Sequence, residues 1–136
     1  MATAIVDGAA LTIGEVARTV GLRTSAIRYY EDAGLLPRAA RVGGKRRYQR
    51  DTIDRLLLVR FSQRLGFSLS DIRRILADPT GRRRKQLWRQ LVDAKLGEID
   101  GLITSARRVQ RVLRESRDCD CVTLSSCRLL QQELSR

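Results

Sequence analysis

Apolar residues recur every three or four positions through the first half of the chain, in short runs that glycine or proline interrupts. Thr12, with Glu15 three positions later, forms the capping-box pattern that begins a helix, and Gly21 ends the apolar run that follows. Thr24 or Ser25 then caps a second short helix. Two short helices joined by a glycine-containing turn predict a helix-turn-helix.

A hairpin and two more helices are expected after this pair. Pro37 blocks helix continuation and the glycine pair at 43–44 indicates a tight turn, so the segment around them predicts a small β wing. Asp51 caps a third helix, and an S-x-x-D capping box at Ser68 begins a fourth that ends before Pro79.

One apolar stripe in the second half is too long for a small domain to bury. Its members are Trp88, Val92, Leu96, Ile99, Ile103, Ala106, Val109 and Leu113. Steps of three or four residues indicate one face of a helix, and charged residues occupy the other faces. We therefore expect a parallel or antiparallel coiled coil with a second copy of the chain, with Trp88 as an anchor of that interface.

The predicted fold class is all-α with a small β wing: a winged helix-turn-helix domain plus a long dimerisation helix. We divide the chain into a flexible leader at 1–10, a DNA-binding domain at 11–79, a dimerisation helix at 80–117 and an effector segment at 118–136. The last segment holds a cysteine-containing loop and a short helix.

The net charge of the chain indicates what kind of molecule it binds. Lys and Arg number 27 against 15 Asp and Glu, which gives a net charge of +12 and a pI near 11.1. Such a chain favours a polyanion, either nucleic acid or an anionic membrane surface. No apolar run reaches the roughly 18 residues that cross a bilayer, and the N-terminus lacks the features of a secretory signal, so we expect a cytoplasmic protein without structural disulfides.

The absence of histidine excludes Cys2His2 zinc sites and histidine-based catalysis, so we expect no enzyme. A thiol oxidoreductase would also lack its C-x-x-C motif here. A constitutive architectural DNA binder, with no effector, remains an alternative.

Basic and hydroxyl side chains gather on the second helix and the wing, where a major groove and its flanking phosphates would be contacted. The candidate DNA contacts are Arg28, Tyr29, Arg46, Arg47 and Tyr48, with Arg18, Thr24 and Ser25 as weaker candidates. Tyr30 lies next to the core stripe and fits a core position equally well.

The segments LTIGEVARTVGLRTSAIRYYEDAGLLPRAARVGGKRRY and RLGFSLSDIRRIL resemble the N-terminal domain of MerR-type transcriptional regulators. The resemblance is dense over residues 11–76 and looser to about Leu130. It implies a homodimer joined by an antiparallel coiled coil, bound to a pseudo-palindromic promoter site in double-stranded DNA. An effector near the dimer helix would then let the protein bend and untwist that DNA, which changes how RNA polymerase engages the promoter.

Three cysteines, Cys119, Cys121 and Cys127, fall in one short segment, and the preceding 118 residues have none. Metal-sensing members of the family carry thiolate ligands here. The Cys119–Cys127 spacing resembles the pair that holds copper(I), and three thiolates could hold a divalent ion of the zinc or mercury class. Divalent-metal relatives also use a partner cysteine where this chain has Arg84 or Lys85, a departure that counts against their geometry.

A second resemblance is to the redox-sensing SoxR branch, which holds a [2Fe-2S] cluster with C-x2-C-x-C-x5-C. This chain matches the last three positions and has Ser116 at the first, so a cluster would need Ser116 or Asp118 as fourth ligand. The cysteines could also be packing residues, or redox-sensitive thiols without a metal.

Overall fold

The computed structural model describes residues 10–135, so the predicted leader at 1–10 lies outside the described residues apart from Ala10. The chain forms two compact units that divide between Leu91 and Val92, and each unit is described by itself. Within the described range, every helix is too short or too polar to span a lipid bilayer.

The first helix of the helix-turn-helix follows the predicted capping signals. Helix α1 (Ile13–Val20) begins after Thr12, whose side-chain oxygen accepts a hydrogen bond from the Glu15 amide, 3.2 Å away. The Glu15 carboxylate accepts in return from the Thr12 amide at 2.8 Å. Gly21 ends the helix with a positive φ of 66°, a conformation that favours glycine. The predicted capping box and helix end are confirmed.

Helix α2 (Thr24–Asp32) begins one residue earlier than expected. Its N-cap is Arg23, which makes no side-chain capping bond, so the prediction that Thr24 or Ser25 is the cap is wrong. Both hydroxyl residues lie inside the first helical turn instead. Gly34, with φ of 77°, follows the helix and reverses the chain.

The wing is a three-stranded antiparallel sheet in the order β1-β3-β2. Strands β2 (Ala40–Val42) and β3 (Lys45–Tyr48) form the expected hairpin, and Gly43 and Gly44 occupy its turn with φ of 58° and 75°. Strand β1 (Leu11–Thr12) pairs with the outer edge of β3 and was not predicted, because two residues are too few to show the alternation of a strand.

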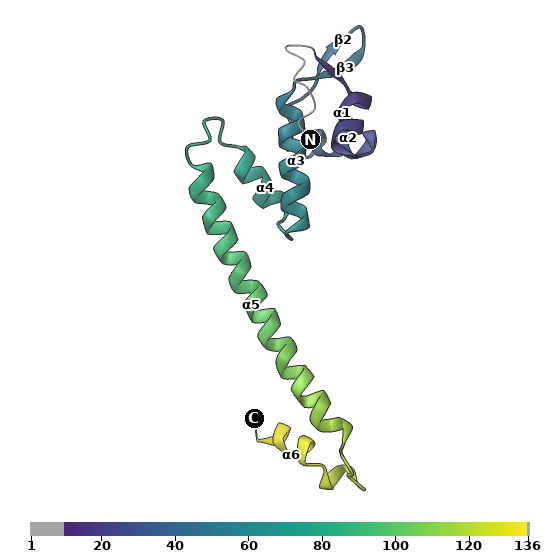
Figure 1. The fold of residues 1–136 in the computed structure, drawn as a ribbon, viewed down its shortest axis with the longest axis vertical. Coiled ribbons are helices and arrows are strands. Elements are labelled where there is room, and N and C mark those ends of the chain that lie inside the picture. Colours follow the sequence, from purple (N-terminus) through teal and green to yellow (C-terminus); the bar gives the residue numbers. More distant parts are fainter. Residues whose placement is uncertain (1–9, 136) are drawn as a thin grey trace. The chain divides into compact units, whose positions relative to one another are not determined.

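Helices α3 (Asp51–Arg64) and α4 (Leu69–Leu76) follow the wing in the first unit, which extends to Leu91 (Figure 1). The capping box of Ser68 with Asp71 is confirmed, whereas α3 is capped by Arg50 and not by Asp51 as expected. Apolar side chains from all four helices and from the wing fill one core. Its fully or nearly fully enclosed members include Val16, Val20, Ile27, Leu35, Tyr48, Leu56, Val59, Ile72 and Ile75.

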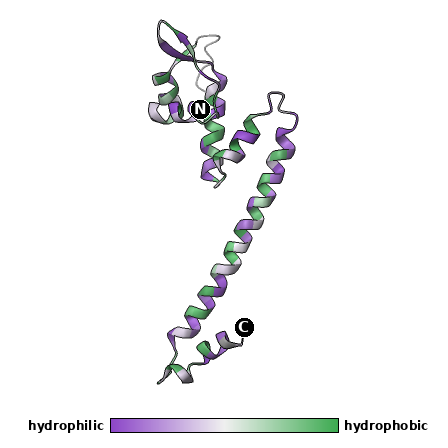
Figure 2. Cartoon of the chain, turned by 180° about the vertical axis from the view of Figure 1, so that it is seen from behind, coloured by the Kyte–Doolittle hydropathy of each residue, from purple (hydrophilic) through white to green (hydrophobic). Residues whose placement is uncertain are grey.

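The long helix α5 (Arg84–Arg117) is continuous over 34 residues, and none of its residues is buried. Figure 2 shows hydrophobic and hydrophilic residues interleaved along its whole length. From Val92 on it belongs to the second unit, which also contains the 3-10 turn η1 (Leu124–Ser126) and helix α6 (Arg128–Leu134). The apolar stripe is therefore an uncovered face of a single chain. Its exposed members are Leu96, Ile99, Ile103, Val109 and Leu113.

Trp88 makes aromatic contacts within its own chain that were not expected. Its ring stacks on Phe61, with 6.1 Å between ring centroids, and packs against Phe67 at 5.3 Å. The indole is therefore half-buried inside the first unit, and its role as an anchor of the interface between subunits stays a prediction. The stripe on its own gave no sign of this, because aromatic partners more than 20 positions away are not visible in a local pattern.

Candidate DNA interface and cysteine site

Helix α2 presents polar and basic side chains on its solvent face. Arg28 and Ser25 are exposed, and 56% of Tyr29 is exposed. Thr24 is half-buried at the start of the helix. On α1, Arg18 is exposed and its Nε donates to the Gly14 carbonyl at 3.4 Å. These predicted residues are thus accessible to a ligand.

Tyr30, whose role the sequence left open, is a core residue. Its side chain is buried, and its hydroxyl donates to the Gln63 side-chain oxygen at 2.9 Å. Consecutive helical residues point about 100° apart, so Tyr29 faces solvent while Tyr30 faces α3. The tyrosine pair therefore divides between surface and core.

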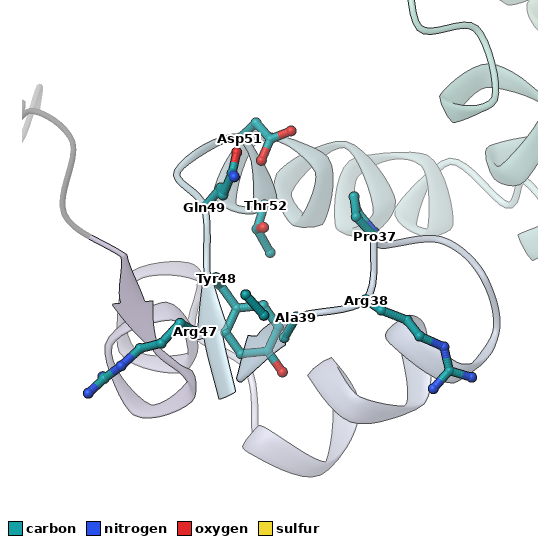
Figure 3. A pocket seen from close by; sticks show the side chains of 9 residues that line it. Pro37, Arg38, Ala39, Arg47, Tyr48, Gln49, Asp51 and Thr52 are labelled. Atoms are coloured by element: carbon teal, nitrogen blue, oxygen red, sulfur yellow. The ribbon is translucent and has the colours of Figure 1, made fainter. Parts of the chain in front are cut away.

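The side chains of β3 alternate between two faces, as in any strand. Arg46 and Tyr48 face α2, where both contact Glu31. Arg47 leaves the strand in another direction, as Figure 3 shows for Arg47 and Tyr48. Only 2% of Tyr48 is exposed, which corrects the prediction that its side chain contacts DNA: a buried phenol cannot reach a phosphate or a base.

Tyr48 is held by a buried carboxylate that the sequence did not single out. Its hydroxyl donates to Glu31 Oε2 at 2.9 Å. Burial, followed by this hydrogen bond, raises the pKa of Tyr48 from 10.0 to about 12, since both favour the neutral phenol. Glu31 was missed because its neighbour Asp32 looks equivalent in the sequence, and only the fold shows which carboxylate turns inward.

A small cavity brings residues of α2 and the wing together. Its volume is about 210 Å³, and it is lined by Thr12, Ile13, Arg28, Lys45 and Arg46. Three of these five side chains carry a positive charge. The structure therefore places two of the predicted DNA contacts, Arg28 and Arg46, at one basic hollow.

The turn that precedes α5 is fixed by Asp78. Its carboxylate accepts from the Thr80 hydroxyl at 2.7 Å and from the Arg83 amide at 2.8 Å. The Thr80 hydroxyl, then the Arg83 amide, lowers the pKa of Asp78 from 3.8 to about 2. Arg84 donates to the Asp78 carbonyl at 3.1 Å, and Lys85 follows it, exposed, in the first turn of α5.

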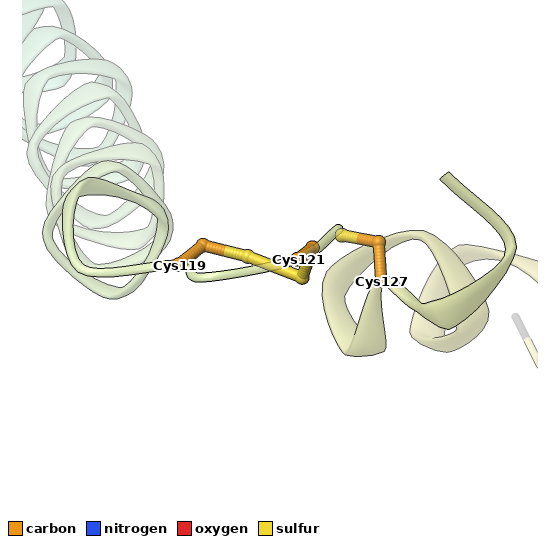
Figure 4. A group of neighbouring side chains, drawn as sticks. All are labelled: Cys119, Cys121 and Cys127. Carbon is orange, nitrogen blue, oxygen red and sulfur yellow. A yellow bond between two sulfur atoms is a disulfide. The ribbon is translucent and has the colours of Figure 1, made fainter. Parts of the chain in front are cut away.

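The three cysteines converge after α5. The sulfur atoms of Cys119, Cys121 and Cys127 all lie within 4.8 Å of one another (Figure 4). Cys119 and Cys121 are joined as a disulfide, and Cys127 is a free, half-buried thiol. This disulfide differs from the expectation of none. Residues two positions apart in an extended loop bring their Cα atoms to 5.5 Å, which is within the usual range for such a bond.

The three cysteines are close enough to share one metal ion once the disulfide is reduced, because the thiolate is the ligand form. At a metal–sulfur distance of about 2.3 Å, two sulfurs on one ion stand about 3.8 Å apart in tetrahedral geometry and about 4.6 Å apart in linear geometry. The bonded sulfurs of Cys119 and Cys121 would have to move apart on reduction to reach such a spacing, whereas the Cys127 sulfur already lies within 4.8 Å of both. The hollow beside the loop is about 660 Å³ and also exposes the carboxylates of Glu115, Asp118 and Asp120.

Each of the two suggested fourth ligands has a contact with a residue close to it in sequence. The Ser116 hydroxyl donates to the Leu113 carbonyl at 2.9 Å, and an Asp118 oxygen lies 3.6 Å from Arg117 Nε. The group of mutually close ligand atoms consists of the three sulfurs.

Comparison with known proteins identifies the family of the chain. Residues 11–78 match the family described as MerR HTH family regulatory protein, and residues 53–116 match MerR, DNA binding. The HTH-type transcriptional activator SoxR homolog of Chromobacterium violaceum is 36% identical over 128 residues, covering 88% of this chain and 82% of that protein. The HTH-type transcriptional regulator ZntR of Escherichia coli K12 is 32% identical over 126 residues, covering 88% and 89%.

Solved structures show the same fold. The transcription regulator PbrR691 from Ralstonia metallidurans CH34, in complex with lead(II), superposes with a TM-score of 0.67 and 29% identity, covering 90% of this chain and 98% of that chain. The sequence relatives, the two family matches and this fold agree with the helix-turn-helix, wing and long helix described above. The chain belongs to the MerR family of DNA-binding transcriptional regulators, which is not an enzyme family.

Proposed function

We propose that the protein works as a homodimer on promoter DNA and changes transcription when its cysteine loop binds a thiolate-ligated metal ion. The observation that carries this proposal is the convergence of three sulfur atoms within 4.8 Å on the loop that follows α5. In the family to which the chain belongs, regulation requires a signal, and this loop is the part of the described chain best suited by its chemistry to receive one.

The exposed stripe of α5 supports the dimer. The apolar residues Leu96, Ile99 and Ile103 are exposed to solvent on a helix of 34 residues. A second copy of the chain carries the same stripe and could cover it. Each apolar side chain that such a contact encloses contributes about 25 cal/mol per Å² of area removed from water. A coiled coil along this face would remove the largest exposed apolar stripe of the second unit from solvent.

Charge on α5 favours the antiparallel arrangement. In the segment 92–103, Asp93, Glu98 and Asp100 against Lys95 leave a net charge of −2. The segment 104–117 has five arginines against one glutamate, a net charge of +4. For an overlap restricted to 92–117, parallel helices would place the two basic segments side by side, whereas antiparallel helices place each basic segment beside the partner's acidic one.

The DNA contacts we propose come from α2 and the wing, with support from α1. Exposed Arg28 and Tyr29 lie on the helix that would enter the major groove, and Arg46 and Arg47 would bind phosphates at the edge of that groove. Arg18, Thr24 and Ser25 are weaker candidates, and Tyr48 is left out because it is buried. Two such units on one dimer would distort the duplex differently in the two states of the loop, so that RNA polymerase engages the promoter in only one of them.

The metal we propose is a soft ion, because thiolates select copper(I), zinc or mercury over hard cations. The relative PbrR691 was solved in complex with lead(II), which supports a metal ion as the effector. Arg84 or Lys85, where divalent-metal relatives have a partner cysteine, would offset the charge of two thiolates that hold a monovalent ion.

An iron-sulfur cluster is the second candidate. It is favoured by the similarity to the SoxR homolog of Chromobacterium violaceum and by the match to three of four cluster cysteines. It is disfavoured by Ser116, whose hydroxyl already bonds the Leu113 carbonyl and which is not a usual cluster ligand.

Anaerobic purification with elemental analysis and visible spectroscopy tests the effector. We expect a protein without sulfide that binds one soft ion per cysteine loop, and a C119S/C121S/C127S variant that binds none and no longer switches a promoter fusion. A V122S variant changes an exposed loop residue without removing sulfur and serves as the control. Stoichiometric iron and sulfide would contradict the soft-ion proposal and support the iron-sulfur cluster. An unchanged promoter response in the triple variant would exclude any signal that depends on the cysteines.

A DNA-binding titration tests the interface. R28A should weaken binding at all salt concentrations, while R89A removes the same charge from an exposed position outside the proposed contacts and should have a much smaller effect. Equal losses in the two variants would mean that only overall charge matters.

A further inference from the structure

Glu31 is an acidic residue buried at the junction of three elements. Only 7% of its side chain is exposed, and it lies on α2 about one turn after the exposed Arg28. One carboxylate oxygen accepts from the Ala39 amide at 3.3 Å in the loop that leads to the wing. The other accepts from the Tyr48 hydroxyl at 2.9 Å and lies 3.7 Å from Arg46 Nε.

Burying a carboxylate costs free energy unless hydrogen bonds and an opposite charge compensate for the lost water. Here both oxygens have partners, and these partners come from the loop and from β3. A single side chain of α2 therefore fixes the position of the wing relative to that helix. Because Tyr48 and Arg46 lie on the same face of β3, fixing one also fixes the other.

Arg46 is the partner of Glu31 that remains accessible, with 32% of its side chain exposed. It lines the 210 Å³ cavity together with Arg28 and Lys45, and the other two lining residues, Thr12 and Ile13, carry no charge. An anion bound at this hollow would be attracted by the positive charges of all three side chains. A guanidinium pair is well matched to the oxygens of a phosphate group.

We propose that Glu31 is a positioning residue for DNA binding: it holds Arg46 at the cavity that Arg28 also lines, so that the two guanidinium groups bind one backbone phosphate. The inference rests on the DNA contacts proposed above and adds to them a buried acid that touches no DNA. It makes the wing and α2 act as one phosphate-binding unit.

The direction in which one substitution changes DNA affinity separates this role from a purely electrostatic effect of charge. E31Q removes a negative charge near DNA, which by charge alone should strengthen binding. If Glu31 positions Arg46, the same variant should bind a promoter duplex about tenfold more weakly, and the slope of log affinity against log salt should become shallower by about one, the signature of one lost phosphate contact. D32N removes an equal charge from the next, exposed residue of α2 and should bind as tightly as the wild type or more tightly.

A double-variant cycle separates positioning from a general loss of structure. If Glu31 acts through Arg46, E31Q/R46A should bind no more weakly than R46A alone. A merely structural role would make the two losses add. Thermal unfolding of each variant verifies that it is folded, and Y48F provides a second route because it removes the hydroxyl that orients Glu31 and leaves every charge at pH 7 in place.

The outcomes are decisive in each case. Weaker binding and a shallower slope in E31Q, or in Y48F if E31Q does not fold, support the proposal. Binding of E31Q equal to that of D32N, additive losses in the cycle, or wild-type binding by Y48F overturns it. A wild-type protein that fails to bind the duplex at all would instead overturn the DNA contacts themselves, so the two failures are distinguishable.

Discussion

The indole ring of Trp88 packs against the ring of Phe67, with 5.3 Å between their centroids, so the start of α5 belongs to the core of the first unit. Phe61 covers the indole as well, at 6.1 Å. Aromatic pairs at such distances contribute beyond the area that they bury. Trp88, the only tryptophan of the chain, thus packs the first turns of α5 against α3 and the residues that follow it.

Replacing Trp88 tests this packing. W88A should lower the free energy of unfolding by about 2 kcal/mol, less than a fully buried tryptophan because the ring is half-exposed. W88F keeps one ring and should recover roughly half of the loss. Chemical denaturation at a single fixed protein concentration measures both, since association changes apparent stability. Equal stability of W88A and the wild type would show that the stacking contributes nothing.

The turn of the wing depends on left-handed backbone at Gly43 and Gly44. A Cβ added at either glycine meets no atom within 4 Å, so alanine there costs only the backbone term, about 1–2 kcal/mol. We expect G44A to unfold at lower denaturant concentration and to bind DNA more weakly, because the wing is displaced. G43N should be tolerated, since asparagine adopts this conformation readily in hairpin turns. A loss in G43N as large as that in G44A would contradict this account.

For the two glycines inside α5, in contrast to those of the wing, replacement by alanine should stabilise the protein. Gly97 and Gly101 lie on the side of the helix away from the apolar stripe, and a Cβ at either one meets nothing within 4 Å. G97A and G101A should therefore each stabilise the protein by about 1 kcal/mol through helix propensity alone. Analytical ultracentrifugation should find the dimer unaffected. Dissociation in either variant would place the interface on the glycine face and not on the stripe.

Alkaline pH should reveal the buried Tyr48–Glu31 bond. The pKa of Tyr48 is raised from 10.0 to about 12, so the stabilisation it reports is complete below pH 10 and is lost as the pH rises through about 12. The free energy of unfolding should fall over this interval more steeply in the wild type than in Y48F. Y29F keeps the buried phenol and should behave like the wild type. Parallel curves for the wild type and Y48F would contradict the raised pKa.

Local signals in the sequence were enough for most of the fold. The capping boxes at Thr12 and Ser68 and the glycine pair of the wing each act within a few residues, and the structure places them as predicted. Capping signals did not predict the starts of α2 and α3. The N-cap residues Arg23 and Arg50 make no side-chain capping bond. Packing of the apolar face decides where these helices start.

The candidate sites were only partly predictable. The cysteine cluster stands out because its members are close in sequence. The inward turn of Tyr48 was not visible, because it depends on Glu31, 17 positions away. The same holds for Trp88, whose aromatic partners lie on α3 and just after it. Contacts between distant segments depend on the fold, and a single sequence does not show them.

A single added thiol tests why this chain would hold an ion and not a cluster. Ser116 lies in the last turn of α5, and its carbonyl accepts from the Cys119 amide at 3.3 Å, so the two side chains are one turn apart. S116C would complete the spacing C-x2-C-x-C-x5-C with a ligand that binds iron. We expect anaerobically purified S116C to contain iron and sulfide and to absorb in the visible range, while the wild type does neither.

S125C is the matched control for this experiment, because it adds a fourth thiol to the same exposed loop outside that spacing. It should remain without a cluster. A cluster in the wild type would mean that Ser116 or a nearby carboxylate already completes the site, and the soft-ion proposal would be wrong. A cluster in both variants would show that the number of thiols, and not their spacing, decides. A cluster in S116C alone would assign the choice between ion and cluster to the one atom by which serine and cysteine differ.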